Sequence, residues 1–280
     1  MYKEDYETLK TYESEGILTV TFNYKKINVL GIPMLKDLNK LCNYLESNEE
    51  LKVVIFNSSN DLFFIAHADI DMLKNMKVSN KSKDEIGIND LAKTLDRINK
   101  LSQVTISQVE GYARGGGHEF ILACDMRFAT PNAVFMQMEC GMGILPCGGG
   151  SARLARVVGL PRALEIILCA EDFNAKEAYR YGTINKVIES DKISDYVYTL
   201  AKRISKFPLR AIKACKKTIY KSIDLDIDKA LKEESYQLAK AISITPAIKR
   251  FTYASDINFQ YSIYNQKNFS KYLMDFQNIK

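Results

Sequence analysis

Three consecutive glycines stand directly before a histidine and a glutamate in the stretch RGGGHE, residues 114–119. The stretch follows the strand-like residues 104–109 and leads into the apolar residues 120–123. Free N–H groups at a helix start favour negative charge, and glycines let a ligand oxygen come within hydrogen-bond distance of the backbone. The pattern predicts either a tight strand-to-helix turn or a backbone site for such an oxygen.

Two further motifs contain residues that could take part in chemistry. In FFIAHADI, residues 63–70, the small residue Ala66 stands between a strand-like segment and a helix with Asp69 near its start. In residues 133–150, Glu139 precedes a glycine-rich loop. Taken alone, Glu119 could be a first-turn acid favoured by the helix dipole, and Glu139 an exposed loop carboxylate. Only their combination makes a catalytic pair of carboxylates a serious alternative.

The elements that must position these motifs alternate in type. Apolar patterning predicts strands at residues 16–22, 51–56, 104–109 and 126–129, and helices at 34–45, 69–76, 88–101 and 118–124. Such alternation favours an α/β core with largely parallel strands. The polar residues 79–85 are predicted to form a surface loop. From residue 161 onward helices dominate, and 186–188 is the only strand-like piece. We therefore expect a core domain at 1–200 and a helical region at 201–280.

In their order and spacing, the three motifs resemble those of the crotonase superfamily, the enoyl-CoA hydratase/isomerase family. The resemblance runs from about residue 16 to about residue 222. It implies an α/β fold, a spiral of stacked ββα turns, with C-terminal helices that build a trimer or a dimer of trimers. It places the acyl-CoA site in the core domain and oligomerisation in the helical region.

The resemblance also implies roles for individual residues. Ala66 and Gly116 match the two backbone N–H donors for a thioester oxyanion, and Glu119 and Glu139 match the two catalytic glutamates of the hydratases. Lys25 and Lys26 precede Asn28 in the segment where the family contacts CoA. Together with the other two motifs, this segment gives the implied substrate-contacting residues: Lys25, Lys26, Asn28, Ala66, His67, Ala68, Asp69, Ile70, Gly115 and Gly116.

Three positions depart from the family pattern. His67 stands where a glycine usually follows the oxyanion alanine, Met138 where a proline often precedes the second glutamate, and Cys147 where a glycine usually follows Pro146. His67 could line the pocket, touch the ligand or face solvent. A separate possibility is a Cys140 or Cys147 nucleophile with His118 as its base, which would require the pair to be in contact.

Composition limits the other classes of protein. The chain has 280 residues, of which 46% are hydrophobic and 26% charged, as in ordinary soluble proteins. Because no apolar run approaches the roughly 20 residues of a membrane span and the start is polar, we expect a cytoplasmic protein. Six scattered cysteines and two histidines give little support for disulfides or a zinc site. A net charge of +5 is only mildly basic, so nucleic acid is a poor candidate partner.

The resemblance implies a lyase that adds water across the 2,3 double bond of a 2-enoyl-CoA. It implies no metal or redox cofactor, and CoA is part of the substrate. Double-bond isomerisation, or cleavage of a C–C bond beside the thioester, would need the same oxyanion donors. A non-catalytic trimeric binding protein is the alternative from another class. The presence of both glutamates favours hydration over the other reactions.

Overall fold

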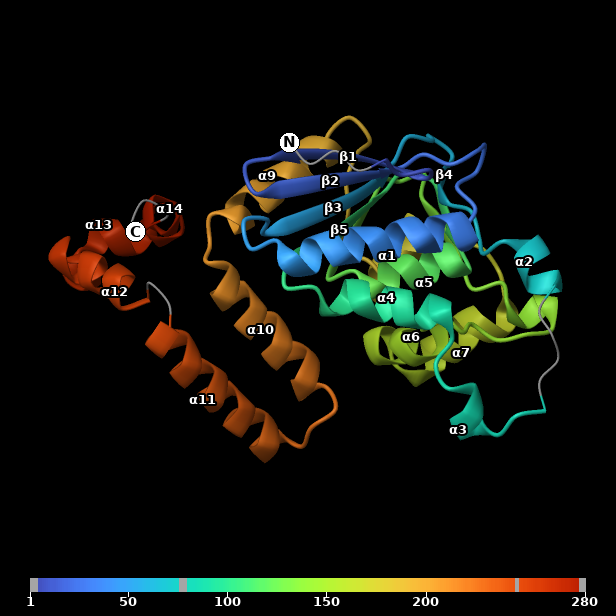
Figure 1. Ribbon diagram of the computed structural model, residues 1–280. Helices are drawn as coiled ribbons and strands as arrows, with labels where there is room; N and C mark the ends of the chain where they lie inside the picture. The colour runs from blue at the N-terminus through green and yellow to red at the C-terminus, as the bar shows by residue number, and fades with distance from the viewer. Residues whose placement is uncertain (1–4, 76–79, 245–246, 277–280) are drawn as a thin grey trace. The chain divides into compact units, whose positions relative to one another are not determined.

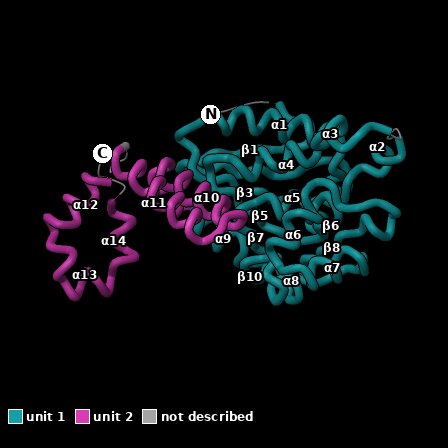
Figure 2. The backbone as a smooth tube through the Cα atoms, turned by 90° about the horizontal axis from the view of Figure 1, so that it is seen from below, with its two compact units in different colours: residues 1–201 teal, residues 202–280 magenta. Residues whose placement is uncertain are grey.

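The computed structural model describes residues 5–75, 80–244 and 247–276 of the chain. Two compact units can be separated by their internal contacts, unit 1 (Met1–Ala201) and unit 2 (Lys202–Lys280), which Figure 2 colours teal and magenta. This boundary falls one residue after the boundary expected from the sequence. The three motifs all lie in unit 1.

A six-stranded sheet forms one layer of unit 1 (Figure 1). Its order is β1 (Leu9–Ser14), β2 (Ile17–Phe22), β3 (Val53–Ser58), β5 (Val104–Val109), β7 (Met126–Ala129) and β10 (Lys186–Val187). Only the β1–β2 pair is antiparallel. The central strands are rich in Val, Ile and Phe and buried on both faces, as parallel strands covered by other layers are.

A second, four-stranded sheet carries the motifs. Its order is β4 (Phe63–Ile65), β6 (Tyr112–Arg114), β8 (Val134–Met136) and β9 (Phe173–Asn174). The strands β4, β6 and β8 are parallel neighbours, and β9 is antiparallel to β8. Each of the first three follows a strand of the large sheet and precedes a helix. The chain therefore repeats a ββα turn, the unit implied by the family resemblance.

Helices cover the sheets. Helices α1 (Ile32–Ser47), α4 (Asp90–Lys100) and α5 (Gly116–Ala123) lie side by side in Figure 1, with α1 against α4 and α4 against α5. The other helical segments of this part are α2 (Ile70–Lys74), α3 (Lys83–Ile86), the 3₁₀ turn η1 (Cys140–Met142), α6 (Gly150–Val158), α7 (Leu160–Cys169), α8 (Ala175–Tyr181) and α9 (Ile193–Ser205). Helix α9 crosses the unit boundary.

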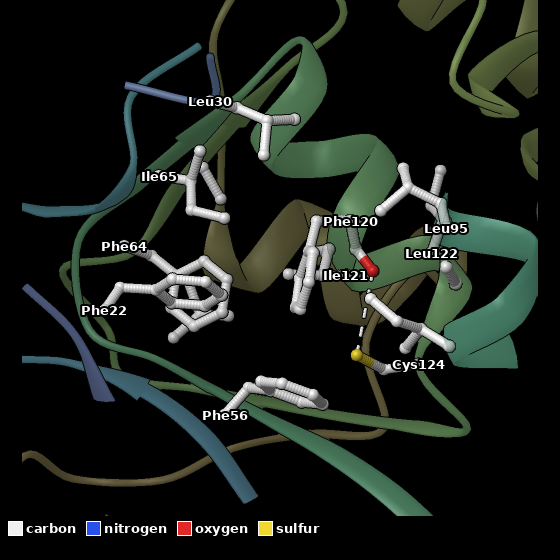
Figure 3. Packing of buried hydrophobic residues seen from close by; sticks show 14 of the residues in the cluster. Phe22, Leu30, Phe56, Phe64, Ile65, Leu95, Phe120, Ile121, Leu122 and Cys124 are labelled. Atoms are coloured by element: carbon white, nitrogen blue, oxygen red, sulfur yellow. Dashed lines mark hydrogen bonds between the residues drawn. The ribbon is translucent and has the colours of Figure 1, made fainter. Parts of the chain in front are cut away.

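The core fixes the helix that bears Glu119. Phe120 of α5 contacts Phe22 and Phe56 edge-on, with ring centroids 5.1 and 5.0 Å apart, and Phe22 contacts Phe64 in the same way at 5.2 Å (Figure 3). All four rings are fully buried. Edge-to-face aromatic pairs add about 0.5–1.5 kcal/mol each to the effect of burial. Because β2, β3, β4 and α5 each supply one ring, the cluster holds α5 in register with both sheets.

Unit 2 is helical throughout its described residues. It contains α10 (Leu209–Ser222), α11 (Ile227–Ile244), α12 (Ala247–Asp256), the 3₁₀ turn η2 (Phe259–Tyr261), α13 (Ile263–Lys267) and α14 (Phe269–Asp275). Helices α10 and α11 pack against each other. In the parts of the chain that the structure describes, none of the helices is both long and apolar enough to span a bilayer.

Three local predictions need correction. The segment 186–188 is not the only strand after residue 161, because β9 (Phe173–Asn174) also lies there. The expected loop at 79–85 contains helix α3, whose first turn carries the acidic residues Asp84 and Glu85 after Ser82; Ser79 lies outside the described residues. The expected helix at 69–76 ends at Lys74 in the structure, and Met76 likewise lies outside the described residues. The sequence reading also missed β1, because this edge strand buries only Leu9 and so lacks a regular apolar pattern.

Candidate active site

The three motifs meet because they follow three neighbouring parallel strands. In the small sheet Ile65 of β4 pairs with Ala113 of β6, and Arg114 of β6 pairs with Met136 of β8. Ala68, Gly116 and Glu139 come two or three residues after these strands end. Adjacent strands lie about 4.8 Å apart, so the segments that follow them enter the same small space.

Glu119 is anchored by a glycine-rich loop. Its side chain is 2% exposed, and its Oε1 accepts hydrogen bonds from the N–H groups of Gly148 (2.6 Å) and Gly150 (2.8 Å). Burial raises the pKa of Glu119, whereas the two N–H bonds and the charge of Arg153 act to lower it. A Cβ on Gly148 would lie 2.6 Å from Glu119 Oε2. Position 148 must therefore remain glycine for the carboxylate to keep this position.

Glu139 is buried with fewer hydrogen bonds than Glu119. It is 9% exposed, and its Oε2 accepts no hydrogen bond from any described residue. Burial and the charge of nearby Glu119 raise its pKa to about 7. A Cβ on Gly115 would lie 2.9 Å from Glu139 Oε1, so that glycine keeps the space beside the carboxylate open. Two neighbouring carboxyl groups with raised pKa values can hold one proton between them near neutral pH.

The structure does not support Ala66 as an oxyanion donor. Its N–H already donates to Ile27 O at 3.2 Å, and its side chain is 2% exposed. Ala68 lines the pocket instead, and its N–H donates to no atom of the described residues. The sequence offered two small residues, Ala66 and Ala68, and nothing in their types separated them. The hydrogen bond to Ile27 decides between them.

Gly116 keeps its expected place. As the first residue of α5 it has a free N–H, as the first residues of any α-helix do. A Cβ added to Gly116 would lie 3.4 Å from the backbone N of Ala68 and 3.0 Å from Leu30 Cδ2. Two free N–H groups, those of Ala68 and Gly116, thus belong to backbone segments in direct contact.

The residues that break the family pattern all line one pocket. His67, Met138 and Cys147 share a pocket of about 940 Å³ with Glu119, Glu139, Ala68 and Gly115. The Nδ1 of His67 lies 2.8 Å from Ala68 O, so the ring packs against the peptide that follows the proposed donor. Of the three possibilities for His67, lining the pocket is the one observed. The departures therefore alter the walls around the carboxylates and leave the fold intact.

The predicted CoA-contacting residues fall into three groups. Asn28 is 1% exposed, and its side chain bonds to Tyr24 N, Ser58 Oγ and Phe64 O, so a ligand role for this side chain is not supported. Asp69 caps α2 through the N–H groups of Asp71 and Met72 and does not line the pocket. Ile70 does line it. Lys25 and Lys26 are exposed, outside the pocket lining.

The cysteine–histidine alternative is wrong. His118 is fully buried against the rings of Phe135 and Phe173, and burial lowers its pKa to about 3. Its Nδ1 is bonded to Gln137, while Cys140 and Cys147 are exposed. Although Cys147 is exposed as a whole residue, partial burial of its thiol and the charges of the two glutamates raise the pKa of that thiol, which disfavours the thiolate. In the described residues, no three His, Cys, Asp or Glu side chains come together as a metal would require.

Arg153 is a further residue of the site, and the sequence analysis did not identify it. Its Nη1 donates to Gly148 O at 3.2 Å, and its Nη2 lies 3.4 Å from Asp96 Oδ1 on α4. The arginine thus ties α4 to the loop whose N–H groups hold Glu119. The sequence signal for this role is that Arg153 follows the glycines 148–150 by about one helical turn. Its charge can then partly neutralise the buried Glu119.

Comparison with known proteins agrees with this geometry. The family model described as enoyl-CoA hydratase/isomerase matches residues 12–255. The chain is 35% identical to the short-chain-enoyl-CoA hydratase of Clostridium acetobutylicum, covering 82% of this chain and 88% of the relative, and 31% identical, with the same coverage, to the crotonyl-CoA hydratase of Syntrophomonas wolfei. A solved enoyl-CoA hydratase structure from Geobacillus kaustophilus superimposes with a TM-score of 0.83 at 26% identity, covering 91% of this chain and 96% of that one.

The chain therefore belongs to the enoyl-CoA hydratase/isomerase family, and its fold is the α/β crotonase fold of two sheets with additional C-terminal helices.

Proposed function

We propose that the protein hydrates the 2,3 double bond of a 2-enoyl-CoA to give a 3-hydroxyacyl-CoA. The observation that carries the proposal is the pair Glu119 and Glu139, two buried carboxyl groups that line one pocket beside two free backbone N–H groups. Hydration needs a base at the attacking water and an acid at C2. The names of the relatives in Clostridium and Syntrophomonas support the same reaction.

The two glutamates have different environments, which suggests different roles. Glu119 accepts two N–H bonds and lies near Arg153, so it is the better holder of negative charge and the base that takes a proton from water. Glu139 has an Oε2 without a partner among the described residues and a pKa near 7, so it is the acid that protonates C2. The water oxygen bonds to C3 as the 2,3 π bond breaks.

The negative charge that develops on the thioester oxygen needs donors that are already in place. We assign these donors to the N–H groups of Ala68 and Gly116. Preorganised donors of this kind contribute about 10²–10³-fold to the rate each. After turnover Glu119 carries the proton of the water and Glu139 is ionised; proton exchange with solvent restores the starting state.

The test is an assay on crotonyl-CoA that follows loss of the conjugated absorbance and identifies the product. Incorporation of one solvent oxygen at C3 and one solvent deuterium at C2 is expected. Migration of deuterium between C2 and C4 of a 3-enoyl-CoA, without hydration, would show an isomerase instead. Tight acyl-CoA binding with no turnover would show a binding protein.

We further propose that the chain forms a homotrimer or a dimer of trimers through unit 2. Helices α10 and α11 leave large apolar side chains exposed: Ile219, Ile227, Leu231, Tyr236 and Leu238. Such side chains gathered on one helical pair mark an association surface. Light scattering should give three or six times the 31.8 kDa mass of one chain. A monodisperse monomer contradicts this proposal.

A further inference from the structure

The pocket beside the carboxylates extends well past the reacting centre. Of the 22 residues that line it, 12 are Ile, Leu or Met. They come from the start of α1, from α2, from the end of α3, from α4 and from the loop after β8. At about 940 Å³, the pocket lies near the top of the 300–1,000 Å³ range that is typical of small-molecule sites.

Much of this apolar lining is open to water. Ile88 and Leu145 are each 65% exposed, and Ile86 and Met142 are each 57% exposed, although all four belong to the same pocket. Apolar side chains gathered in one hollow mark a place where an apolar group binds, because its binding removes their surface from water. The hollow is continuous with the glutamates, so the occupant best placed to cover it is the acyl chain of the thioester.

The described lining includes no bulky barrier, and apart from the two glutamates its charged side chains are the exposed Lys74, Asp90 and Lys93. Among the described residues that form it, His67 is the only one with a ring, and its Nδ1 already faces Ala68 O. Asp90 and Lys93 pair with each other at 3.5 Å, and their side chains are 92% and 61% exposed. Asn89 bonds to Cys147 O and caps α4. The flexible Met72, Met138 and Met142 can adapt to a chain of variable length.

We propose that this pocket selects acyl chains of medium length, about eight carbons or more, over the four-carbon crotonyl group. The proposal rests on the hydratase function proposed above and specifies its substrate class. Each methylene moved from water into the apolar lining contributes about fourfold to binding (about 0.8 kcal/mol). A bound crotonyl group leaves most of the apolar lining in contact with water, whereas a decenoyl group covers it.

The first experiment measures kcat/KM for trans-2-enoyl-CoA substrates of four to twelve carbons. We expect at least a tenfold rise between four and eight carbons. A profile that is flat or that falls from four carbons upward overturns the proposal while leaving the hydratase function intact.

A plug variant tests the pocket wall itself. Ile88→Trp places a large ring in the lining, so kcat/KM for the ten-carbon substrate should fall at least tenfold more than kcat/KM for crotonyl-CoA, because the smaller group needs less of the pocket. The matched control is Leu62→Trp, the same kind of change at a residue that is 64% exposed and outside the pocket. This control should leave the ratio of the two substrates unchanged. Equal losses on both substrates in Ile88→Trp contradict the proposal.

Binding of saturated thioesters separates this inference from the proposed function, because butanoyl-CoA and decanoyl-CoA cannot be hydrated. Below the concentration at which decanoyl-CoA forms micelles, we expect it to bind at least tenfold tighter than butanoyl-CoA. Tighter binding without turnover of any enoyl-CoA would refute the hydratase and preserve the acyl pocket. Equal binding, together with a change of oligomeric mass in Ile88→Trp, would mean that a second chain covers these residues, which refutes the acyl pocket.

Discussion

The two sides of the pocket are built in opposite ways. On the side of α5, Glu119 lies on a helix fixed by four buried phenylalanine rings and accepts two backbone N–H bonds. On the side of α2, α3 and the start of α4, the lining is aliphatic and largely exposed, as at Ile86 and Ile88. The difference agrees with the proposed division between one side that performs the chemistry and another that receives the acyl chain.

The largest effect should come from the side proposed to perform the chemistry. Glu119→Gln and Glu139→Gln each keep the shape of the side chain but remove its proton transfer, so kcat should fall by about 10²–10⁴-fold with a much smaller change in KM. The double variant should lose little more than the worse single variant, because the two residues act as a unit. Glu165→Gln, at an exposed position on α7, is the control. One silent glutamate would contradict hydration by a pair.

The backbone donor at Gly116 can be tested by two substitutions that differ in one N–H. Proline is tolerated at the first position of a helix, so Gly116→Pro removes the donor, and Gly116→Ala adds a Cβ but keeps it. We expect the proline variant to lose about 10²–10³-fold in kcat beyond the alanine variant. Both variants crowd Leu30 and Ala68, so that cost is common to the two. Equal rates in the two variants would remove Gly116 from the donor pair.

Arg153 should show a smaller effect with a characteristic pH signature. Arg153→Gln loosens the loop that holds Glu119, so kcat should fall roughly tenfold to a hundredfold. The charge of Arg153 lowers the pKa of Glu119. Its loss therefore raises that pKa, and the low-pH limb of kcat/KM should move to higher pH. Arg156→Gln on the same helix is the control, because Arg156 bonds to Ala152 O of its own turn. A lower rate without a shifted limb would indicate a purely structural role.

The smallest effect concerns stability. Because the pKa of Glu139 is raised to about 7 in the folded protein, the folded state binds more protons than the unfolded chain between about pH 4.5 and 7, and stability is lost as pH rises through this window. Glu139→Gln should remove that loss. The free energy of unfolding of Glu139→Gln, relative to that of the parent chain, should be higher at pH 8 than at pH 4 by on the order of 1 kcal/mol. Water in the pocket keeps this difference below the full effect of the pKa shift. Urea unfolding at the two pH values measures it; an equal difference at both contradicts the raised pKa.

The sequence predicted the elements that bury a regular apolar face. The strands at 104–109 and 126–129 have the expected bounds, whereas exposed β1 and short α3 carry no such pattern. Within the site, the resemblance pointed to Glu119 and Glu139, and the structure places both in the lining of one pocket. It pointed to Ala66, whose N–H donates to Ile27 O in the structure, and so did not identify Ala68. It also did not predict that the side chain of Asn28 bonds to β3 and β4. Contacts between segments distant in the chain decided these points.

The parallel run of β4, β6 and β8 has a consequence for how this protein can change. One part of the proposed reaction centre follows the end of each strand: Ala68 follows the first, Gly116 and Glu119 the second, and Glu139 the third. The proposed reacting groups thus follow three neighbouring strands, and the sheet sets the spacing between them. The residues between α2 and α4 come after β4 and before β6 in the chain. Insertions or deletions there can therefore change the apolar wall of the pocket while the proposed reacting groups keep their spacing. The preferred acyl chain can therefore change in evolution while the reaction stays the same.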